Sequence, residues 1–310
     1  MSHSPSPQHA LTLVDPIAEA RMSRKTAISG QPWLHGEVAR QMAERLPWIR
    51  HPVRCWLDWA PSRGGLGSVS SVSSRWPEAQ ALFFEPDPIL LHKTQKALQP
   101  VWWKRWIGRT PAPQKTDLTN AGQEVDMVWC NMQLHMASDP LKWMGQWSQA
   151  LRPDGFVMFS CLGPDSLREI RALYEAHDWP APHHPWVDMH DWGDLLLKAG
   201  FAQPVMDMTH LTLTYPDAKA LLQDLRTLGR NLHPDRFKGL RGRTWHLDLC
   251  NQLHKRLASD RHNGRLALTF EVVFGHAFKA SARSTAQNIA TLDLGEVRAM
   301  LKKTGKGQDG

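Results

Sequence analysis

The sequence lacks long apolar runs, and this absence limits where the protein is expected to act. No uninterrupted hydrophobic stretch approaches the roughly 18 residues that predict a membrane-spanning helix. Residues 1–27 also lack the continuous apolar core that follows the basic start of a secretory signal. We therefore expect no membrane span and no membrane partner, and a cytoplasmic location is the default expectation.

Cysteine is scarce, with four residues in 310, and no two of them form a CxxC pair. This spacing predicts neither a zinc site nor a disulfide framework. The 16 histidines show no HExxH or comparable ligand spacing, so we expect no metal site. His183 and His184 lie in a proline-rich loop and are expected at the surface. Cys55, Cys130 and Cys161 fall in predicted strands, where they are expected to be small core residues.

One stretch predicts a strand, a helix and a second strand in succession. Residues 125–130 and 156–162 are apolar runs of strand length, and the intervening helical pattern stops at a turn over residues 152–155. Two buried strands joined by a helix form the crossover of a parallel sheet. Because ligands bind beyond the carboxyl ends of such strands, Asn131 and His135 are expected at a functional edge.

A nucleotide-type site is predicted upstream of this crossover. The first predicted strand, 52–59, carries Asp58 and leads into a turn that contains Gly64. Glu85 follows the second predicted strand, 79–84. Such a turn brings backbone amides close to a ligand, and an acid after the second strand accepts hydrogen bonds from a ribose diol. Each feature alone is weak, since Asp58 also suits a turn and Glu85 a solvated strand end.

The remaining pattern places a helical insertion near the end of the sheet. Residues 216–264 read as helical, with a break at 231–242, and they separate two predicted strands. Residues 1–30 are rich in serine and proline and are expected to be flexible, and residues 280–310 read as a polar tail that could form a short helix. The other elements predicted are helices over 33–47, 88–98, 164–177 and 189–198, and strands over 201–208, 211–215 and 266–278.

Positive charge is concentrated in the insertion. The chain has a formal net charge of +7, which suits nucleic acid, an anionic membrane or an acidic protein as partner. Nucleic acid is not expected, because no RRM, KH, helix-turn-helix or RGG pattern accompanies the charge. The basic residues of the insertion are Lys219, Arg226, Arg230, Arg236, Lys238, Arg241 and Arg243.

Several segments together resemble a known enzyme family. The segments WLDWAPSRGG, FFEPDP, VDMVWCNMQLH, LRPDGFVMFSCLGPDSL and VDMHDWGDLLLKAGFAQPVMD, in that order, are similar to the class I S-adenosylmethionine-dependent methyltransferases. The later LTLTYPDAKALLQDLRTLGRN and GRLALTFEVVFGHAF resemble the malonyl-acyl-carrier-protein O-methyltransferases of biotin synthesis. The resemblance covers most of residues 30–279 and leaves out both ends of the chain.

The resemblance implies an α/β fold with a Rossmann-like, mostly parallel seven-stranded sheet, helices on both faces and a helical insertion before the last strand. It implies a methyltransferase domain over 31–279 that includes a helical cap over 216–264. The cofactor implied is S-adenosylmethionine, the acceptor is the free carboxylate of a malonyl thioester, and no catalytic base is obligatory. The acidic acyl carrier protein is the implied partner, bound by the basic cap over 219–243.

The implied site residues fall into two groups. Arg226 is the first candidate to hold the malonyl group, Arg230 is the second, and His135 is a further substrate contact; for both arginines the alternative is a solvated helix charge. The cofactor-binding residues implied are Asp58, Ala60, Ser62, Gly64, Glu85, Pro86 and Asn131.

The chain departs from the family in its cofactor loop. The usual pattern is close to D-x-G-x-G-x-G, and Ala60 and Ser62 stand where two of the glycines are expected, with Gly64 retained. A Cβ at Ala60 narrows the approach of a ligand to the backbone, and Pro61 removes a donor. Two alternatives follow: a methyltransferase-fold protein that has lost the cofactor and binds carrier protein or assists assembly, and a relative with another substrate, such as the hydroxylase that assists assembly of respiratory complex I.

Overall fold

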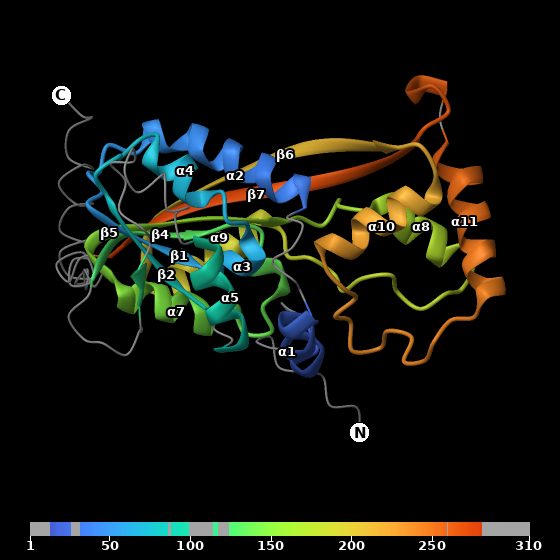
Figure 1. Cartoon of the computed structure of the whole chain (residues 1–310), viewed down its shortest axis with the longest axis horizontal. Coiled ribbons are helices and arrows are strands. Elements are labelled where there is room, and N and C mark those ends of the chain that lie inside the picture. Colours follow the sequence, from blue (N-terminus) through green and yellow to red (C-terminus); the bar gives the residue numbers. More distant parts are fainter. Residues whose placement is uncertain are drawn as a thin grey trace, which may run out of the picture. The chain divides into compact units, whose positions relative to one another are not determined.

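A seven-stranded sheet with the order β3-β2-β1-β4-β5-β7-β6 forms the centre of this computed structural model (Figure 1). All neighbours pair in parallel except β7, which is antiparallel to both β5 and β6. This order confirms the predicted Rossmann-like, mostly parallel sheet. The strands are β1 (Cys55–Trp59), β2 (Gln80–Phe84), β3 (Gln114–Lys115), β4 (Val125–Cys130), β5 (Leu151–Leu162), β6 (Phe201–Tyr215) and β7 (Leu266–Lys279).

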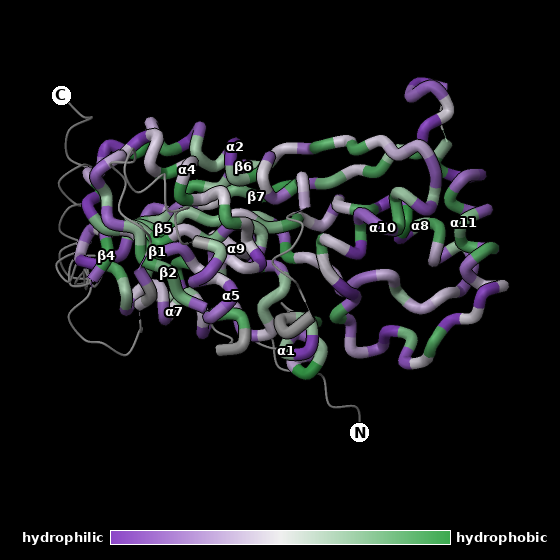
Figure 2. Tube along the Cα trace, in the orientation of Figure 1, coloured by the Kyte–Doolittle hydropathy of each residue, from purple (hydrophilic) through white to green (hydrophobic). Residues whose placement is uncertain are grey.

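Helices cover both faces of the sheet. Buried side chains of α2, α4, α8, α10 and α11 form one apolar core, and those of α7 and α9 form the core on the opposite face. In Figure 2 the central strands are coloured as hydrophobic, whereas the helices mix both colours, as expected for amphipathic elements. The helices are α1 (Pro16–Lys25), α2 (Trp33–Arg45), α3 (Pro61–Gly64), α4 (Ser68–Ser73), α5 (Pro88–Leu98), α7 (Pro140–Ala150), α8 (Arg168–Glu175), α9 (Met189–Lys198), α10 (Ala218–Leu228) and α11 (Arg243–Leu257), with the short 3₁₀ helices η2 (Leu46–Trp48), η3 (Leu134–Met136) and η4 (Asp260–His262).

The structure describes residues 13–25, 32–85, 88–98, 114–116, 124–258 and 260–280. The described residues up to Lys279 form one compact unit. The predicted polar tail with its short helix lies outside the described residues, apart from Ala280. No helix within the described ranges has the length and apolar character needed to cross a membrane.

The central crossover follows the prediction with one correction. α7 begins at Pro140, where Asp139 caps it by accepting a hydrogen bond of 2.9 Å from the Lys142 N–H. The predicted turn at 152–155 is wrong in part, because β5 already begins at Leu151. A register shift against β4 and the left-handed φ of 65° at Asp154 absorb the bend within the strand.

The sheet edge and the insertion also differ in detail from the prediction. The two short strands predicted over 201–215 form one strand, β6, which pairs with β7 from Phe201–Lys279 to Tyr215–Leu266. The predicted break between the two strands was wrong, because the polar residues Thr209 and His210 also pair with β7, at the solvated edge of the sheet. α10 and α11 lie between β6 and β7 in the chain, and they pack against these strands and against each other (Figure 1). We call residues 216–264 the cap.

The cysteines behave as core residues. Cys55, Cys130 and Cys161 are buried, Cys250 is half-buried, and all four are free thiols. Burial raises the pKa of the Cys55 thiol, and it raises that of Cys130 more strongly. This agrees with the predicted role of small apolar side chains in the strands.

A glycine in β7 tests the packing of this sheet. A Cβ at Gly275 would lie 2.4 Å from the ring of Phe159, which is fully buried, and 2.9 Å from the Met206 sulfur. We expect Gly275→Ala to lower the free energy of unfolding by about 2 kcal/mol, because the ring has no space into which to move. Gly193→Ala is the matched control. A Cβ at Gly193 would lie 3.7 Å from the Met206 side chain, which is ordinary contact. Because Gly193 lies within α9, where alanine is the better helix former, the free energy of unfolding should rise by up to about 1 kcal/mol. Urea denaturation measures both, and equal effects would contradict the packing argument.

Candidate functional site

Three buried polar side chains lie where neighbouring strands of the sheet end. Asp58 is in β1, Glu85 directly follows β2 and Asn131 directly follows β4, with exposed fractions of 4%, 7% and 3%. Asp58 pairs in register with Phe83 of β2 and with Trp129 of β4, so the three strand ends are adjacent. The structure therefore brings together three of the residues that the sequence predicts for cofactor binding.

Glu85 has its hydrogen-bond partners within the chain. The Ser62 N–H donates to Oε1 over 2.8 Å, and the Ser62 hydroxyl donates to Oε2 over 2.9 Å. The Thr94 hydroxyl also donates to Oε1, over 3.3 Å. Burial raises the pKa of Glu85, whereas the hydrogen bonds from Ser62 and the charge of Arg63 lower it. Glu85 is thus a buried acceptor that already binds one hydroxyl of the chain itself.

The predicted cofactor loop forms the short helix α3, with Ala60 directly before the helix and Ser62 inside it. Ala60, the residue before the helix, is buried and has the left-handed φ of 53°, and its N–H donates to the Phe84 carbonyl over 2.8 Å. Glycine would adopt this φ without the steric cost of a Cβ. Pro61 is the first residue of α3, where its missing N–H costs no helical hydrogen bond. Ser62 follows it and points to Glu85.

Asn131 holds the loop against the end of β4. A Cβ at Gly64 would lie 2.8 Å from the Asn131 backbone oxygen, so this close approach requires glycine. The Asn131 amide donates to the Gly64 carbonyl over 2.5 Å and to the His35 carbonyl over 3.0 Å, and its oxygen accepts from the Ser160 hydroxyl over 2.9 Å. Contact between Asn131 and a cofactor stays a prediction. Pro86, also predicted for this site, lies outside the described residues.

Asp58 is fully enclosed beneath this loop. The Ser68 hydroxyl donates a hydrogen bond to its carboxyl oxygen Oδ2. Burial raises the pKa of Asp58 to about 8, the Ser68 hydrogen bond opposes this shift, and the nearby Glu85 charge adds to it. The carboxyl group is therefore largely neutral at neutral pH, and it is bonded to the first turn of α4, the helix that follows the loop.

This raised pKa predicts a pH-dependent stability. Between about pH 4, where an unfolded aspartate titrates, and about pH 8, the folded state binds more protons than the unfolded state, so stability falls as pH rises. Asp58→Asn, which cannot ionise, should remove this pH-dependent part of the free energy of unfolding. We expect the melting temperature of the native chain to fall relative to that of Asp58→Asn between about pH 5 and about pH 8. A difference that does not change with pH would show that Asp58 does not titrate in this range.

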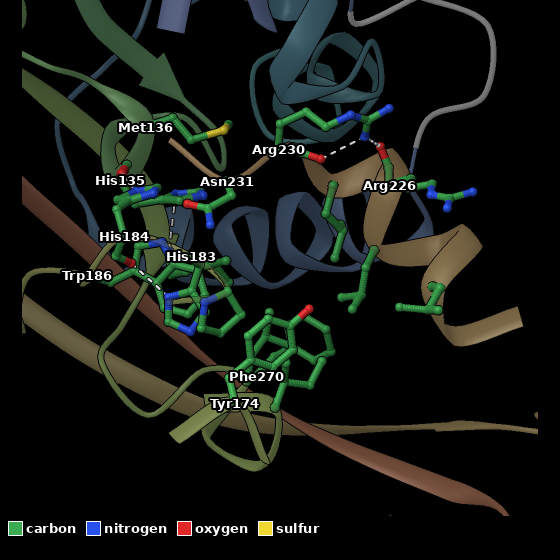
Figure 3. A pocket seen from close by; sticks show the side chains of 18 of the residues that line it. His135, Met136, Tyr174, His183, His184, Trp186, Arg226, Arg230, Asn231 and Phe270 are labelled. Carbon is green, nitrogen blue, oxygen red and sulfur yellow. Dashed lines mark hydrogen bonds between the residues drawn. The ribbon is translucent and has the colours of Figure 1, made fainter. Parts of the chain in front are cut away.

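A pocket of about 240 Å³ lies among η3, α8, the loop 182–186 and the cap. Its wall is mostly apolar, and its polar groups lie in two places. Figure 3 shows three histidines with Trp186 on one side and two arginines on the other. The apolar lining includes Leu167, Ile170, Tyr174, Leu222, Leu225, Leu249, Leu253 and Phe270, and the polar lining includes His135, His183, His184, Arg226, Arg230 and Asn231.

His135, predicted as a substrate contact, lines this pocket as a neutral imidazole. Burial lowers its pKa well below the usual range. The Leu162 N–H donates to its Nδ1 over 3.3 Å, so the ring hydrogen is on Nε2. His184 donates from Nε2 to the His135 carbonyl over 2.8 Å and thereby holds this segment in place. His135 can therefore donate one hydrogen bond to a group in the pocket.

The expectation that His183 and His184 lie at the surface is wrong. His184 is 4% exposed, and His183 is half-buried, with its ring stacked on Trp186 at a centroid distance of 3.9 Å. Burial lowers the pKa of both imidazoles, that of His183 to about 4. A proline-rich loop has no apolar periodicity from which its burial could be predicted. Its histidines are buried because the cap packs over the loop.

The expectation of no metal site rested on spacing alone. Asp165, His210 and Glu271 do lie within reach of a common point, but two of the three are exposed.

The two predicted arginines belong to the end of α10. Arg230 donates from its guanidinium to the carbonyls of Arg226, over 2.5 Å, and Gly229, over 2.8 Å. Arg226 belongs to the last turn of α10 and Gly229 directly follows the helix, so Arg230 caps it. The side chain of Arg226 is exposed and forms no hydrogen bond or ion pair with any residue that the structure describes. Both line the pocket, and their contact with a substrate stays a prediction.

An N-terminal helix, α1, packs against Met136 of the pocket lining, although residues 1–30 were expected to be flexible. Val14, Ala18 and Met22 pack with Met136 and Leu232 in a small apolar cluster. The Asp15 N–H donates to the Leu232 carbonyl, and the Asp15 carboxylate pairs with the Arg236 guanidinium over 2.8 Å. The helix was not predicted because α1 has few apolar residues, and these are buried by Met136 and Leu232, which lie far away in the chain.

The chain is similar to known methyltransferases over most of its length. Residues 33–203 match the family described as "Methyltransferase domain". Malonyl-acyl-carrier protein O-methyltransferase from Laribacter hongkongensis is 38% identical, over 81% of this chain and 84% of its own. Proteins of the same name from Gallionella capsiferriformans and a Methylovorus species are 35% and 34% identical, over 84% and 81% of this chain and 88% and 83% of their own. The similarity therefore extends beyond the matched domain into the cap.

Proposed function

The chain belongs to the family of malonyl-acyl-carrier protein O-methyltransferases, and we propose that it transfers the methyl group of S-adenosylmethionine to the free carboxylate of a malonyl thioester on acyl carrier protein. The product is a methyl ester at an early step of biotin synthesis. The observation that carries this proposal is the similarity of 34–38% that includes the cap, where substrate choice is expected to lie.

The residues at the strand ends fit an adenosyl cofactor. A ribose diol requires a buried acceptor after β2, and Glu85 occupies that position and already accepts a hydroxyl. The tight approach of Gly64 to β4, where a Cβ would lie 2.8 Å from a carbonyl oxygen, keeps the loop at this edge. We assign Glu85 to the ribose, Asn131 to support of the loop and Asp58 to support of α4, which follows the loop.

Methyl transfer requires little acid–base chemistry from the protein. The bound cofactor supplies a methyl group on a positively charged sulfur, and an ionised carboxylate is already a nucleophile at neutral pH. The chain therefore contributes alignment and exclusion of water. The apolar pocket wall, with Leu222, Leu225 and Phe270, excludes water from the acceptor. No general base is required.

The polar groups of the pocket support a carboxylate substrate. Arg226 is exposed at the pocket wall and has a free guanidinium among the described residues, so it is available to pair with the malonyl carboxylate. His135 offers a neutral Nε2–H for the thioester carbonyl or the carboxylate. A neutral donor on one side of the pocket and one exposed cation on the other orient a carboxylate without the desolvation cost of a fully buried ion pair.

The cap also offers a surface for an acidic carrier protein. Phe237 and Leu240 are 48% and 101% exposed, and the basic residues Lys238 and Arg243 lie beside them and are exposed. Arg241 is held over the Trp245 ring at 4.0 Å and over the Phe237 ring at 4.4 Å. Exposed apolar side chains within a positive surface suit a negatively charged helix that also carries apolar residues.

Reversing charge on this surface should weaken carrier recognition selectively. We expect Lys238→Glu combined with Arg243→Glu to raise the KM for the malonyl carrier about tenfold at low ionic strength, and to leave the KM for malonyl-coenzyme A nearly unchanged. The effect should shrink at about 0.5 M salt, because exposed charges are screened. Lys142→Glu with Lys198→Glu is the control, since these exposed lysines lie on α7 and α9 over the opposite face. Equal changes in both acceptors would contradict docking at the cap.

Complementation tests the proposed function in the cell. A biotin auxotroph that lacks its own malonyl-carrier methyltransferase should grow without biotin when it expresses this chain. The same strain should not grow with Glu85→Ala expressed at an equal level. Failure of the native chain, with folded protein present, would contradict the proposal and favour a carrier-binding or assembly role.

A further inference from the structure

The Ser62 hydroxyl occupies the acceptor that a cofactor ribose requires. It donates to Glu85 Oε2 over 2.9 Å, and both residues are buried, with exposed fractions of 8% and 7%. The donor is a hydroxyl, which is the same chemical group as the ribose hydroxyls. The chain thus carries its own hydroxyl donor on the carboxylate that it is expected to use for the cofactor.

Few acceptor sites remain on Glu85. A carboxylate offers about four lone-pair sites, two on each oxygen. Oε1 accepts from the Ser62 N–H over 2.8 Å and from the Thr94 hydroxyl over 3.3 Å, and Oε2 accepts from the Ser62 hydroxyl. One site on Oε2 is left, which is too few for the two hydroxyls of a ribose diol. Both hydroxyls can bind only if a present partner leaves.

Ser62 is the partner most able to leave. Thr94 belongs to the eleven-residue helix α5 and is fully buried, whereas Ser62 lies in the four-residue α3. α3 follows the left-handed Ala60, whose φ of 53° is unfavourable for a side chain other than glycine. A rotation of the Ser62 side chain alone releases Oε2, and a small shift of the loop also releases Oε1.

From this arrangement we infer that Ser62 competes with the ribose hydroxyls of the cofactor for Glu85, and that this competition sets the affinity for S-adenosylmethionine. The inference rests on the proposed function, since it concerns the same cofactor. Where the family pattern has glycine, no hydroxyl is present to compete. Ser62 is therefore a residue that tunes cofactor affinity, and it also holds the loop closed when no cofactor is bound.

Calorimetric titration with S-adenosylhomocysteine and with S-adenosylmethionine tests the inference. We expect Ser62→Ala to bind both about tenfold more tightly than the native chain, because one charge-assisted hydrogen bond no longer has to be broken. The melting temperature of the cofactor-free variant should fall by a few degrees. Ser71→Ala is the matched control, since its hydroxyl, in the neighbouring α4, bonds among the described residues only to the Gly67 carbonyl.

A second pair of variants separates competition from a general change in the loop. In a Glu85→Gln background, Ser62→Ala should give no gain in affinity, because the two effects act through one carboxylate. The inference would be overturned, with the proposed function intact, if the native chain binds the cofactor and Ser62→Ala binds it equally or more weakly. A gain of equal size in Ser71→Ala, or one that persists in the Glu85→Gln background, would also overturn it. Absence of binding by every variant would overturn the proposed function and the inference together.

Discussion

Replacing Glu85 by alanine is expected to weaken the binding of S-adenosylmethionine by at least about 100-fold, and to reduce methyl transfer accordingly. Two hydrogen bonds from a ribose to a charged acceptor contribute about 1.5–3 kcal/mol each, and alanine removes both. The substitution also leaves the buried N–H and hydroxyl of Ser62 without their acceptor. Calorimetry with S-adenosylhomocysteine measures the loss directly.

Glu78→Ala provides the comparison for this variant. Glu78 is exposed between α4 and β2, so its removal should change neither the affinity nor the melting temperature. Circular dichroism establishes that Glu85→Ala is folded before the titration is interpreted. Affinity within a factor of about three of the native value, in folded Glu85→Ala, would remove Glu85 from the cofactor site.

Replacing Arg226 by alanine should raise the KM for the malonyl carrier about tenfold, with little change in cofactor affinity. The loss of one charge-assisted hydrogen bond to the malonyl carboxylate corresponds to a factor of ten or more. Because the guanidinium has no described partner within the chain, stability should not change. Steady-state kinetics at saturating S-adenosylmethionine, together with a titration of the cofactor, separates the two effects.

Two further variants make the Arg226 experiment specific. Arg226→Lys keeps the charge and should recover part of the lost affinity, although it cannot form a bidentate pair. Lys198→Ala removes an exposed cation of α9, on the opposite face of the sheet from the cap, and should behave like the native chain. A KM that rises equally in Arg226→Ala and Lys198→Ala would assign the effect to general surface charge.

The sheet and the cofactor edge were predictable because they depend on local patterns. Asp58 lies near the end of the first predicted strand and Glu85 directly follows the second, and the parallel pairing of these strands places their ends side by side. The Ser62 hydrogen bonds were not predictable, since they depend on the left-handed turn at Ala60. A sequence pattern shows only that glycine is absent; it does not show which group the replacement contacts.

The walls of the pocket depend on contacts between distant segments, which a periodic pattern does not reveal. His184 is buried where its own ring donates to the His135 carbonyl, 49 residues earlier in the chain. α1 packs against Leu232 of the cap and has too few apolar residues to predict a buried helix. Such elements are stabilised mainly by tertiary packing, which overrides their local propensity.

Intact-mass spectrometry of the carrier protein tests the central claim most directly. The purified chain is incubated with S-adenosylmethionine and malonyl-loaded acyl carrier protein, with acetyl-loaded carrier as the acceptor that lacks a free carboxylate. The account predicts that the malonyl carrier gains the mass of one methyl group in place of a proton, and that the acetyl carrier is unchanged. An unmodified malonyl carrier, under conditions where the chain binds the cofactor, would contradict the account.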